Sequence, residues 1–401
     1  MFSISCSLFE NTNSSVGVNN VYVAKQGSDE IAVINLNSYI IDYIDIDYPT
    51  ADCSNIYEPS ECNNSSGCHW MQNFFGDFYC HSMNMDGPHF TVIDEELNYL
   101  FVSNIESGWI GQYDALSHEL IDTVIVGNMP ALMVVDKNLK KLYISKMMTM
   151  VGMEQESRSI SVIDYSNQKF LLESQSIELG SPSPHALAIN STGNQIFVAT
   201  YEGDWLFKID AFNKSIIDQK PLELGFSEDK SFPIKRLKPV QCTMANDSLL
   251  FIACEGGSWT SGSFQDSIPG QVQMWNTNSM ELIDSFEFDV MSRPWHIVSS
   301  PIENNVYVVL KGKQNTGLYP NSNGVASISF ANNTLELNWK IHNDQFHLLH
   351  GIDISDNGKR LFISGESDGN LYEISSDEGA ILNTIFIGNN SKLQGVTFFS
   401  K

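Results

Sequence analysis

The sequence predicts an all-β chain folded as a closed ring of seven repeated four-stranded units. Two observations predict this fold class: a short β-rich motif recurs six times, and the two ends of the chain together supply the parts of a seventh unit. The apolar runs are short, are separated by polar turns and have no 3.6-residue periodicity. Strands are therefore expected throughout, rather than helices.

The repeated motif opens with proline or leucine, alternates apolar residues, makes a polar turn and continues with an aliphatic-aromatic pair. In five of the six copies the aliphatic residue of that pair lies twelve positions after the opening residue, and the copy that opens at Pro239 is one residue shorter. The opening residues are Pro88, Pro130, Pro184, Pro239, Pro294 and Leu349, and the aliphatic residues are Leu100, Leu142, Ile196, Leu250, Val306 and Leu361. These two segments are expected to be the first and second strands of each unit.

Further strands follow in every unit. Residues 161–164, 273–276 and 370–374 are examples of a third strand, and residues 120–127 of a fourth. Four strands per unit, at a spacing of roughly 42 to 55 residues, are typical of the blades of a β-propeller.

The chain ends complete the ring. The N-terminal strands at 20–25 and 31–35 begin in the middle of a blade, and the C-terminal run 393–399 is a first strand without its own partners. Joining them makes a seventh blade and leaves no exposed sheet edge. The expected domain is a propeller over residues 18–401, preceded by a flexible tail at 1–17.

The motif as a whole resembles a known repeat. A proline, often followed by histidine, then alternating apolar residues and a Leu-Phe/Tyr-Val strand, is similar to the YVTN repeat of YncE-like seven-bladed β-propellers. The resemblance covers roughly Val18 to Phe399. It implies the fold and leaves the function open, because such rings serve as lactonases, as cytochrome-like reductases and as binding scaffolds.

Composition excludes several classes of function. The chain has 48 acidic and 22 basic residues and a net charge of −26. This charge disfavours nucleic acid and anionic lipid as partners. No apolar run is long enough to span a bilayer, and 42% hydrophobic residues suffice for a folded core.

Four of the seven cysteines lie in the segment 48–87, which is rich in Asn, Ser, Gly and aromatic residues. A small insertion of this kind on the top face of the ring is expected to be held by two disulfides. The four cysteines are Cys53, Cys62, Cys68 and Cys80, and they allow three connectivities. A zinc site that includes His69 and His81 is the alternative, but paired C-x2-C spacing is missing.

Disulfides indicate an oxidising, extracytoplasmic compartment, meaning the periplasm, the cell surface or a secreted state. The segment ending at Cys6 is similar to the end of a lipobox, so Cys6 is a candidate lipid anchor and the tail a lipoprotein remnant. The alternative is an ordinary residue in a flexible tail. Cys242 and Cys254 lie on adjacent predicted strands, where a further bridge could form but is not required.

One face of the ring collects the long loops. The link into each first strand and the loop between the second and third strands are expected to share this top face. The long segments at 48–87, 146–159, 255–270 and 311–324 all map to it, whereas the turns of the opposite face are short. The functional site is therefore predicted at the top of the central channel.

The residue after each strand-opening residue is expected to point at the mouth of that channel. In blade order from the second blade these residues are His89, Ala131, His185, Val240, Trp295, His350 and Gln394. Histidines that converge on an axis from separate blades can coordinate a metal. The predicted ligands are His89, His185 and His350, with His296 beside Trp295 and His81 from the insertion.

Copper is the metal that the surrounding residues favour. The run 146–153 contains four methionines, Met150 among them, and thioether plus imidazole is a ligand set that copper prefers. The stretch 81–104 is similar to the His-rich blade of the nitrous-oxide reductase propeller, but it lacks adjacent histidines, so a tetranuclear cluster is not expected. The alternative is structural: histidines that bond between blades and methionines that pack in an apolar loop.

Three functions remain open. The first is a metal-binding propeller, and the second is a scaffold that recognises a small molecule, a protein or a glycan at the top face. The third is a lactonase-like hydrolase that uses histidine with a carboxylate or Arg293. Expected ligand-contacting residues are Trp295, Arg293, Gln394, Met150 and Trp259, and calcium could bind at Asp45 and Asp47, although that spacing is unspecific.

Overall fold

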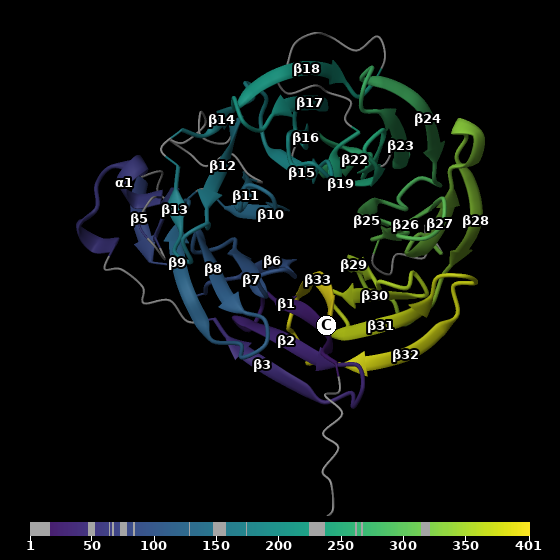
Figure 1. The fold of residues 1–401 in the computed structure, drawn as a ribbon, viewed down its shortest axis with the longest axis horizontal. Coiled ribbons are helices and arrows are strands. Elements are labelled where there is room, and N and C mark those ends of the chain that lie inside the picture. The colour runs from purple at the N-terminus through teal and green to yellow at the C-terminus, as the bar shows by residue number, and fades with distance from the viewer. Residues whose placement is uncertain are drawn as a thin grey trace, which may run out of the picture.

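A computed structural model describes most of the chain. The described residues are 17–46, 53–63, 65, 68–72, 78–82, 85–127, 129–146, 158–173, 175–223, 237–260, 263–265, 268–313 and 321–401. Over these residues the fold is all-β, as the sequence predicts, with seven blades of antiparallel strands arranged in a ring (Figure 1). A central channel is lined by residues from the first strand of every blade.

The first four blades follow the chain around the ring. Blade 1 contains β1 (Asn19–Lys25), β2 (Glu30–Asn35), β3 (Ile41–Asp45) and the C-terminal β33 (Leu393–Ser400). Blade 2 contains β6 (Pro88–Asp94), β7 (Tyr99–Asn104), β8 (Trp109–Asp114) and β9 (Leu120–Ile125). Blade 3 contains β10 (Pro130–Asp136), β11 (Lys141–Lys146), β12 (Ser159–Asp164), β13 (Leu171–Leu172) and β14 (Ile177–Glu178). Blade 4 contains β15 (Pro184–Ile189), β16 (Gln195–Thr200), β17 (Trp205–Asp210) and β18 (Ser215–Pro221).

Three more blades complete the circle. Blade 5 contains β19 (Pro239–Asn246), β20 (Leu249–Cys254), β23 (Gln271–Asn276) and β24 (Glu281–Glu287), with the small hairpin β21 (Ser258–Thr260) and β22 (Ser263–Gln265) in its top loop. Blade 6 contains β25 (Pro294–Ser299), β26 (Asn305–Leu310), β27 (Gly324–Ser329) and β28 (Glu336–Ile341), with a 3-10 turn at Ala331–Asn333. Blade 7 contains β29 (Leu349–Ile354), β30 (Arg360–Gly365), β31 (Asn370–Ser375) and β32 (Ile381–Phe386).

The first strands of the blades form the wall of the channel. In order around the ring they are β33, β6, β10, β15, β19, β25 and β29, and each contacts the next (Figure 1). The second strands lie between neighbouring blades and are buried along nearly their whole length, as in β7. Burial from both sides explains why these second strands read as continuous apolar runs rather than as alternating patterns.

The two ends of the chain share blade 1, as the sequence predicts. Strand β33 pairs with β1 from Asn19 opposite Ser400 to Lys25 opposite Leu393. Beyond the last pair, the Lys401 backbone N–H donates to the Val18 carbonyl at 2.8 Å. Strand β33 therefore joins the C-terminus to the N-terminal strand β1 and also forms the channel wall of blade 1.

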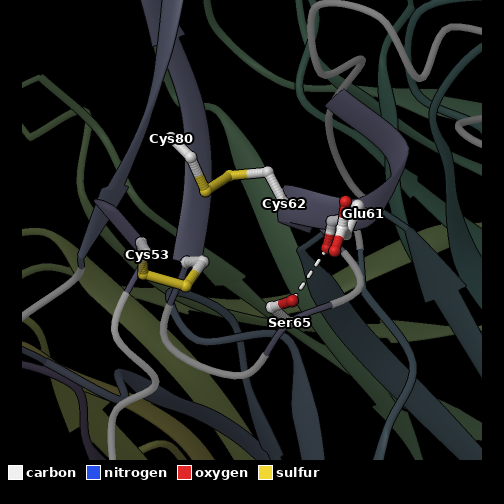
Figure 2. The surroundings of a disulfide bond; sticks show 6 residues. Cys53, Glu61, Cys62, Ser65 and Cys80 are labelled. Atoms are coloured by element: carbon white, nitrogen blue, oxygen red, sulfur yellow. Dashed lines mark hydrogen bonds between the residues drawn. A yellow bond between two sulfur atoms is a disulfide. The ribbon is translucent and has the colours of Figure 1, made fainter. Parts of the chain in front are cut away.

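The cysteine-rich insertion is a small unit with its own buried cluster. It contains a 3-10 turn (Cys53–Asn55), α1 (Pro59–Asn63), and the hairpin of β4 (Cys68–Gln72) with β5 (Phe78–Ser82). Its two disulfides join Cys53 to Cys68 and Cys62 to Cys80 (Figure 2), which confirms the predicted pair of bridges and settles their connectivity. Figure 2 also shows Ser65 Oγ donating to the Glu61 carbonyl at 2.8 Å.

The disulfides also decide the zinc alternative. The sulfur atoms of Cys53, Cys68 and Cys80 lie within 4.8 Å of one another, but all three belong to disulfide bonds and are not thiolate ligands. Cys242 and Cys254 are buried free thiols, so the optional third bridge does not form. Their strands pair Pro239 with Cys254 and Cys242 with Ile252, so the two cysteines are not directly opposite.

Candidate functional site

A left-handed residue precedes the first strand of every blade. The seven residues are Gly87, Met129, Ser183, Lys238, Arg293, Leu348 and Lys392, and their φ angles lie between 45° and 67°. Six of them are not glycine, and this conformation costs each of the six roughly 1–2 kcal/mol. A cost repeated around the whole ring indicates that the link into the channel requires this sharp turn.

A β-bulge follows at once. In all seven blades the pairing of the first strand with the second shifts register just after the strand-opening residue; Pro88 to Phe90 and Leu349 to Ile352 are examples. A bulge redirects a side chain and bends the strand. The position that the sequence assigns to the channel mouth is therefore the bulged one.

Three of the predicted histidines meet from three blades. His296 (β25) and His350 (β29) have ring centroids 4.7 Å apart, and His89 (β6) and His350 have centroids 5.5 Å apart. We call these residues, together with His185 (β15), the histidine cluster. His185 interacts electrostatically with each of the other three. All four side chains are buried, none more than 6% exposed.

Two glycines allow this close approach. Blade 1 lies between blades 7 and 2, so His89 and His350 can touch only if the intervening strand carries no bulky group. A Cβ on Gly351 would lie 2.3 Å from the Gln394 carbonyl oxygen, and one on Gly395 would lie 2.9 Å from the Phe90 Cα. Any side chain at these two positions would push the first strands apart and separate the two imidazoles.

Hydrogen bonds fix the tautomers of two histidines. His185 Nδ1 bonds to the Val240 carbonyl, which can only accept, so Nδ1 carries the proton and Nε2 a lone pair. His89 Nδ1 lies 3.4 Å from Gln26 Oε1, while Gln26 Nε2 donates to Glu106 Oε1 at 3.1 Å. The Glu106 carboxylate thus orients the amide so that its oxygen accepts from His89.

Three ring nitrogens of the cluster are buried without a partner. Among the described residues, His185 Nε2, His296 Nε2 and His350 Nδ1 have no hydrogen bond. An unsatisfied buried polar atom costs about 1–3 kcal/mol, so native proteins rarely retain several in one place. These nitrogens can exchange hydrogen bonds with channel water or donate lone pairs to a bound group.

The imidazoles are kept neutral. Burial lowers the pKa of His89 to about 3 and that of His185 to about 4. Burial also holds the pKa values of His296 and His350 well below the usual value, and neighbouring histidines and Lys311 lower them further. Neutral imidazole is the form that binds a metal or acts as a base.

A charged rim surrounds the cluster. Lys311 Nζ lies 4.2 Å from the centre of the Trp295 ring and 2.7 Å from Glu366 Oε2. Arg293 Nε donates to the buried Glu255 carboxylate at 2.7 Å, and the Tyr201 hydroxyl donates to the same carboxylate. The Trp295 ring contacts His350 at 5.5 Å and so connects this rim to the cluster.

Four residues of this rim are not predicted from the sequence: Tyr201, Glu255, Lys311 and Glu366. All four occupy one repeat position, the residue directly after the second strand of blades 4, 5, 6 and 7. Alignment of that position across the repeats is the signal that would have found them. The pairing of Arg293 with Glu255, by contrast, joins two blades and has no signal in the sequence.

Other predicted site residues are not brought to the cluster. The backbone of His81 lies in β5 of the insertion, which Figure 1 places at the outer margin of the ring. Gln394 is buried in the channel wall, where its carbonyl accepts from Ser364 Oγ. Met150, Cys6, Asp47 and the side chain of Trp259 lie outside the described part of the chain, so these interpretations remain predictions.

Imidazole nitrogens are suitable ligands for a metal ion, but the ring nitrogens of the cluster do not form a close group of three in this structure. Within the described residues, no three histidine, cysteine or carboxylate donors lie within 4.8 Å of one another apart from the disulfide cysteines.

Comparisons with known proteins identify the fold. No protein-family model matches the chain, and no curated protein does. A solved structure from Lactobacillus plantarum is similar, with a TM-score of 0.64 and 12% identity over 96% of this chain and 100% of the other. The periplasmic gluconolactonase of Pseudomonas aeruginosa gives 0.62 and 12% over 95% and 99%. A candidate 6-phosphogluconolactonase from Bacteroides uniformis gives 0.61 and 14% over 95% and 99%.

The chain is a seven-bladed β-propeller. At these identities the likeness concerns the fold alone, and lactonase-like propellers are among its structural neighbours. The resemblances to YncE-like propellers and to the nitrous-oxide reductase propeller stay predictions. Among the described residues no helix has the length and apolar character needed to cross a membrane.

Proposed function

We propose that the protein is an extracytoplasmic binding propeller that holds one transition-metal ion, with copper as the favoured metal, at the histidine cluster. The observation that carries this proposal is the group of three unpartnered buried ring nitrogens on His185, His296 and His350. His89, which contacts His350, is the fourth member of the ligand set. Imidazole nitrogen is a good ligand for copper in either oxidation state.

Two further features support a metal. His185 donates its Nδ1 proton to a backbone carbonyl, the arrangement that usually orients a metal-binding imidazole. The depressed pKa values mean that no proton competes for the lone pairs at neutral pH. Lys311 opposes a cation, and its ion pair with Glu366 offsets that repulsion.

The compartment is part of the same proposal. Two disulfides in a small insertion are typical of proteins that fold outside the reducing cytoplasm. There, a copper-binding propeller would act in metal capture or as the support for a copper centre. Lipid attachment at Cys6 remains a prediction outside the described residues.

Elemental analysis of the protein purified without chelator tests the metal. We expect about one equivalent of copper after anaerobic loading with Cu(I), and a loss of at least tenfold in affinity for His296→Gln and His350→Gln. His342→Gln, at an exposed histidine of blade 6, is the matched control and should bind as the wild type does. Less than a tenth of an equivalent of any transition metal, with no recovery on copper addition, would overturn the proposal.

A lactonase-like hydrolase is the second candidate. It is favoured by the free Nε2 of His185 close to the network of Tyr201, Glu255 and Arg293, and by lactonase-like neighbours in fold. Here His185 Nε2 would act as the general base on water, and Arg293 would bind an anionic group of the substrate. Turnover of a sugar lactone that is abolished in His185→Gln supports this function, and turnover that survives the substitution rejects the site.

A further inference from the structure

The channel holds a second chemical environment below the histidine cluster. A cavity of about 390 Å³ occupies the lower part of the ring and reaches the exposed residues Glu95 and Lys137 at the face opposite the long loops. Phe90 lines the cavity and its ring centroid lies 5.9 Å from that of His296, whereas none of the four cluster histidines lines the cavity. The cavity is therefore a distinct site that opens on the other face.

One carboxylate stands out in the wall of this cavity. The residues four positions after each strand-opening residue all line it, and they are Val92, Val134, Ala188, Thr243, Val298, Asp353 and Thr397. Six of these seven are apolar or carry only a hydroxyl, and the seventh is Asp353. An acid at one position of an otherwise uncharged ring requires an explanation in terms of packing or of a ligand.

Packing within the chain does not neutralise Asp353. Its Oδ1 accepts from the Ile354 N–H at 2.8 Å and its Oδ2 from the Phe398 N–H at 2.7 Å. No cationic side chain of the described residues forms an ion pair with it. Each oxygen has one lone pair left for the cavity, and the side chain is half-buried, so its negative charge is only partly solvated and has no counter-ion.

The surrounding charges give the same picture. Asp356 and Glu95 act on Asp353 by electrostatic repulsion, which raises its pKa. Lys137 is paired with Glu95, and Arg360 of the adjacent strand is paired with Glu373. Across the channel, burial raises the pKa of the Cys242 thiol, which leaves it uncharged. Lys137 and Arg360 are thus each paired with another carboxylate, and neither neutralises Asp353.

We propose that the lower channel binds a small organic cation, with Asp353 as its counter-ion and the apolar ring as its cage. Val92, Val134 and Val298 would contact a methylated or alkyl shell, and Phe90 and Phe398 add aromatic surface that favours cations. The volume lies in the usual range for small-molecule sites. The net charge of −26 raises the local concentration of cations around the molecule.

Calorimetric titration of the full chain with choline tests the inference, because choline keeps its charge at every pH. At pH 8 we expect saturable binding of choline and binding at least tenfold weaker for its uncharged isostere, 3,3-dimethylbutan-1-ol. Equal affinity for the two compounds would overturn the proposal without any variant. Asp353→Asn should weaken choline at least tenfold, whereas Asp356→Asn, at the exposed turn below, should not.

A pH series provides the decisive second measurement. Burial raises the pKa of Asp353 to about 7, so the fraction ionised falls about tenfold between pH 8 and pH 6. Choline affinity should fall about tenfold over that range in the wild type and should not change in Asp353→Asn. A wild-type affinity that is independent of pH, or an Asp353→Asn variant that binds as tightly as the wild type, sinks the assignment.

Discussion

The imidazole rings of His296 and His350 meet edge to face across the boundary between blades 6 and 7, with centroids 4.7 Å apart. Neither ring can take up a proton without placing a buried charge against the other, because each is at most 2% exposed. The burial of these two imidazoles therefore makes the free energy of unfolding depend on pH, because both rings bind protons readily once the chain unfolds.

Acid destabilisation is the first prediction. The cluster histidines have folded-state pKa values below the unfolded value of about 6.5, so their contribution is full above pH 6.5 and is lost as the pH falls toward 4. Asp353 changes the stability in the opposite direction. Its raised pKa keeps it protonated in the folded protein at pH 5, where the same carboxyl is ionised in the unfolded chain. At pH 5 the unfolded chain therefore binds more protons than the folded protein does, and the free energy of unfolding falls as the pH falls from 6.5 toward 4.

Chemical denaturation between pH 7 and pH 5 measures this slope. His296→Gln should reduce it by about one proton, and His342→Gln, at an exposed histidine, should not. Identical slopes for the wild type and His296→Gln would show that the cluster is not neutral in the folded protein.

Disulfide removal should act locally. The two bridges close segments of 15 and 18 residues, for which loop entropy gives roughly 3 kcal/mol each, and they pack against each other in a cluster separate from the blades. Replacing Cys53 and Cys68 by serine is expected to open the insertion to proteolysis while the thermal midpoint of the propeller changes little. A fall of the main transition comparable to that of a core variant would show that the insertion supports the ring.

The closing strand should be a point of high sensitivity. Phe399 is 1% exposed and packs with Tyr22 and Leu100 between blades 1 and 2. Phe399→Ala is expected to cost about 3–5 kcal/mol in the free energy of unfolding. The partly buried neighbour Phe398 is the control, and its alanine variant should lose clearly less in urea denaturation.

The left-handed turn before each blade offers a stabilising substitution. Lys392 is exposed and has a φ of 45°, so Lys392→Gly removes backbone strain without removing buried contacts. We expect a gain of about 0.5–1 kcal/mol, after the greater freedom of glycine in the unfolded chain is subtracted. Asn389→Gly, nearby but outside the positive-φ set, should be neutral or destabilising, and a larger gain there would contradict the strain argument.

Much of the site follows from the repeat. His89, His185 and His350 share one position of the motif, so the repeat alone predicts their placement at the channel mouth. The repeat could not show that Gly351 and Gly395 let two of them touch across blade 1, because that distance depends on how tightly three strands pack. It also could not pair Arg293 with Glu255, which come from different blades.

The amino-acid sequence by itself determined the all-β class, the seven blades, the closure of blade 1 and the presence of disulfides, because each is written as a local pattern repeated along the chain. Only the tertiary structure decided which cysteines pair, which histidine nitrogens lack partners and that Asp353 faces a cavity without a counter-ion. These properties depend on distances of a few ångströms between residues from separate blades. The packing of neighbouring blades sets those distances, and no periodicity encodes them.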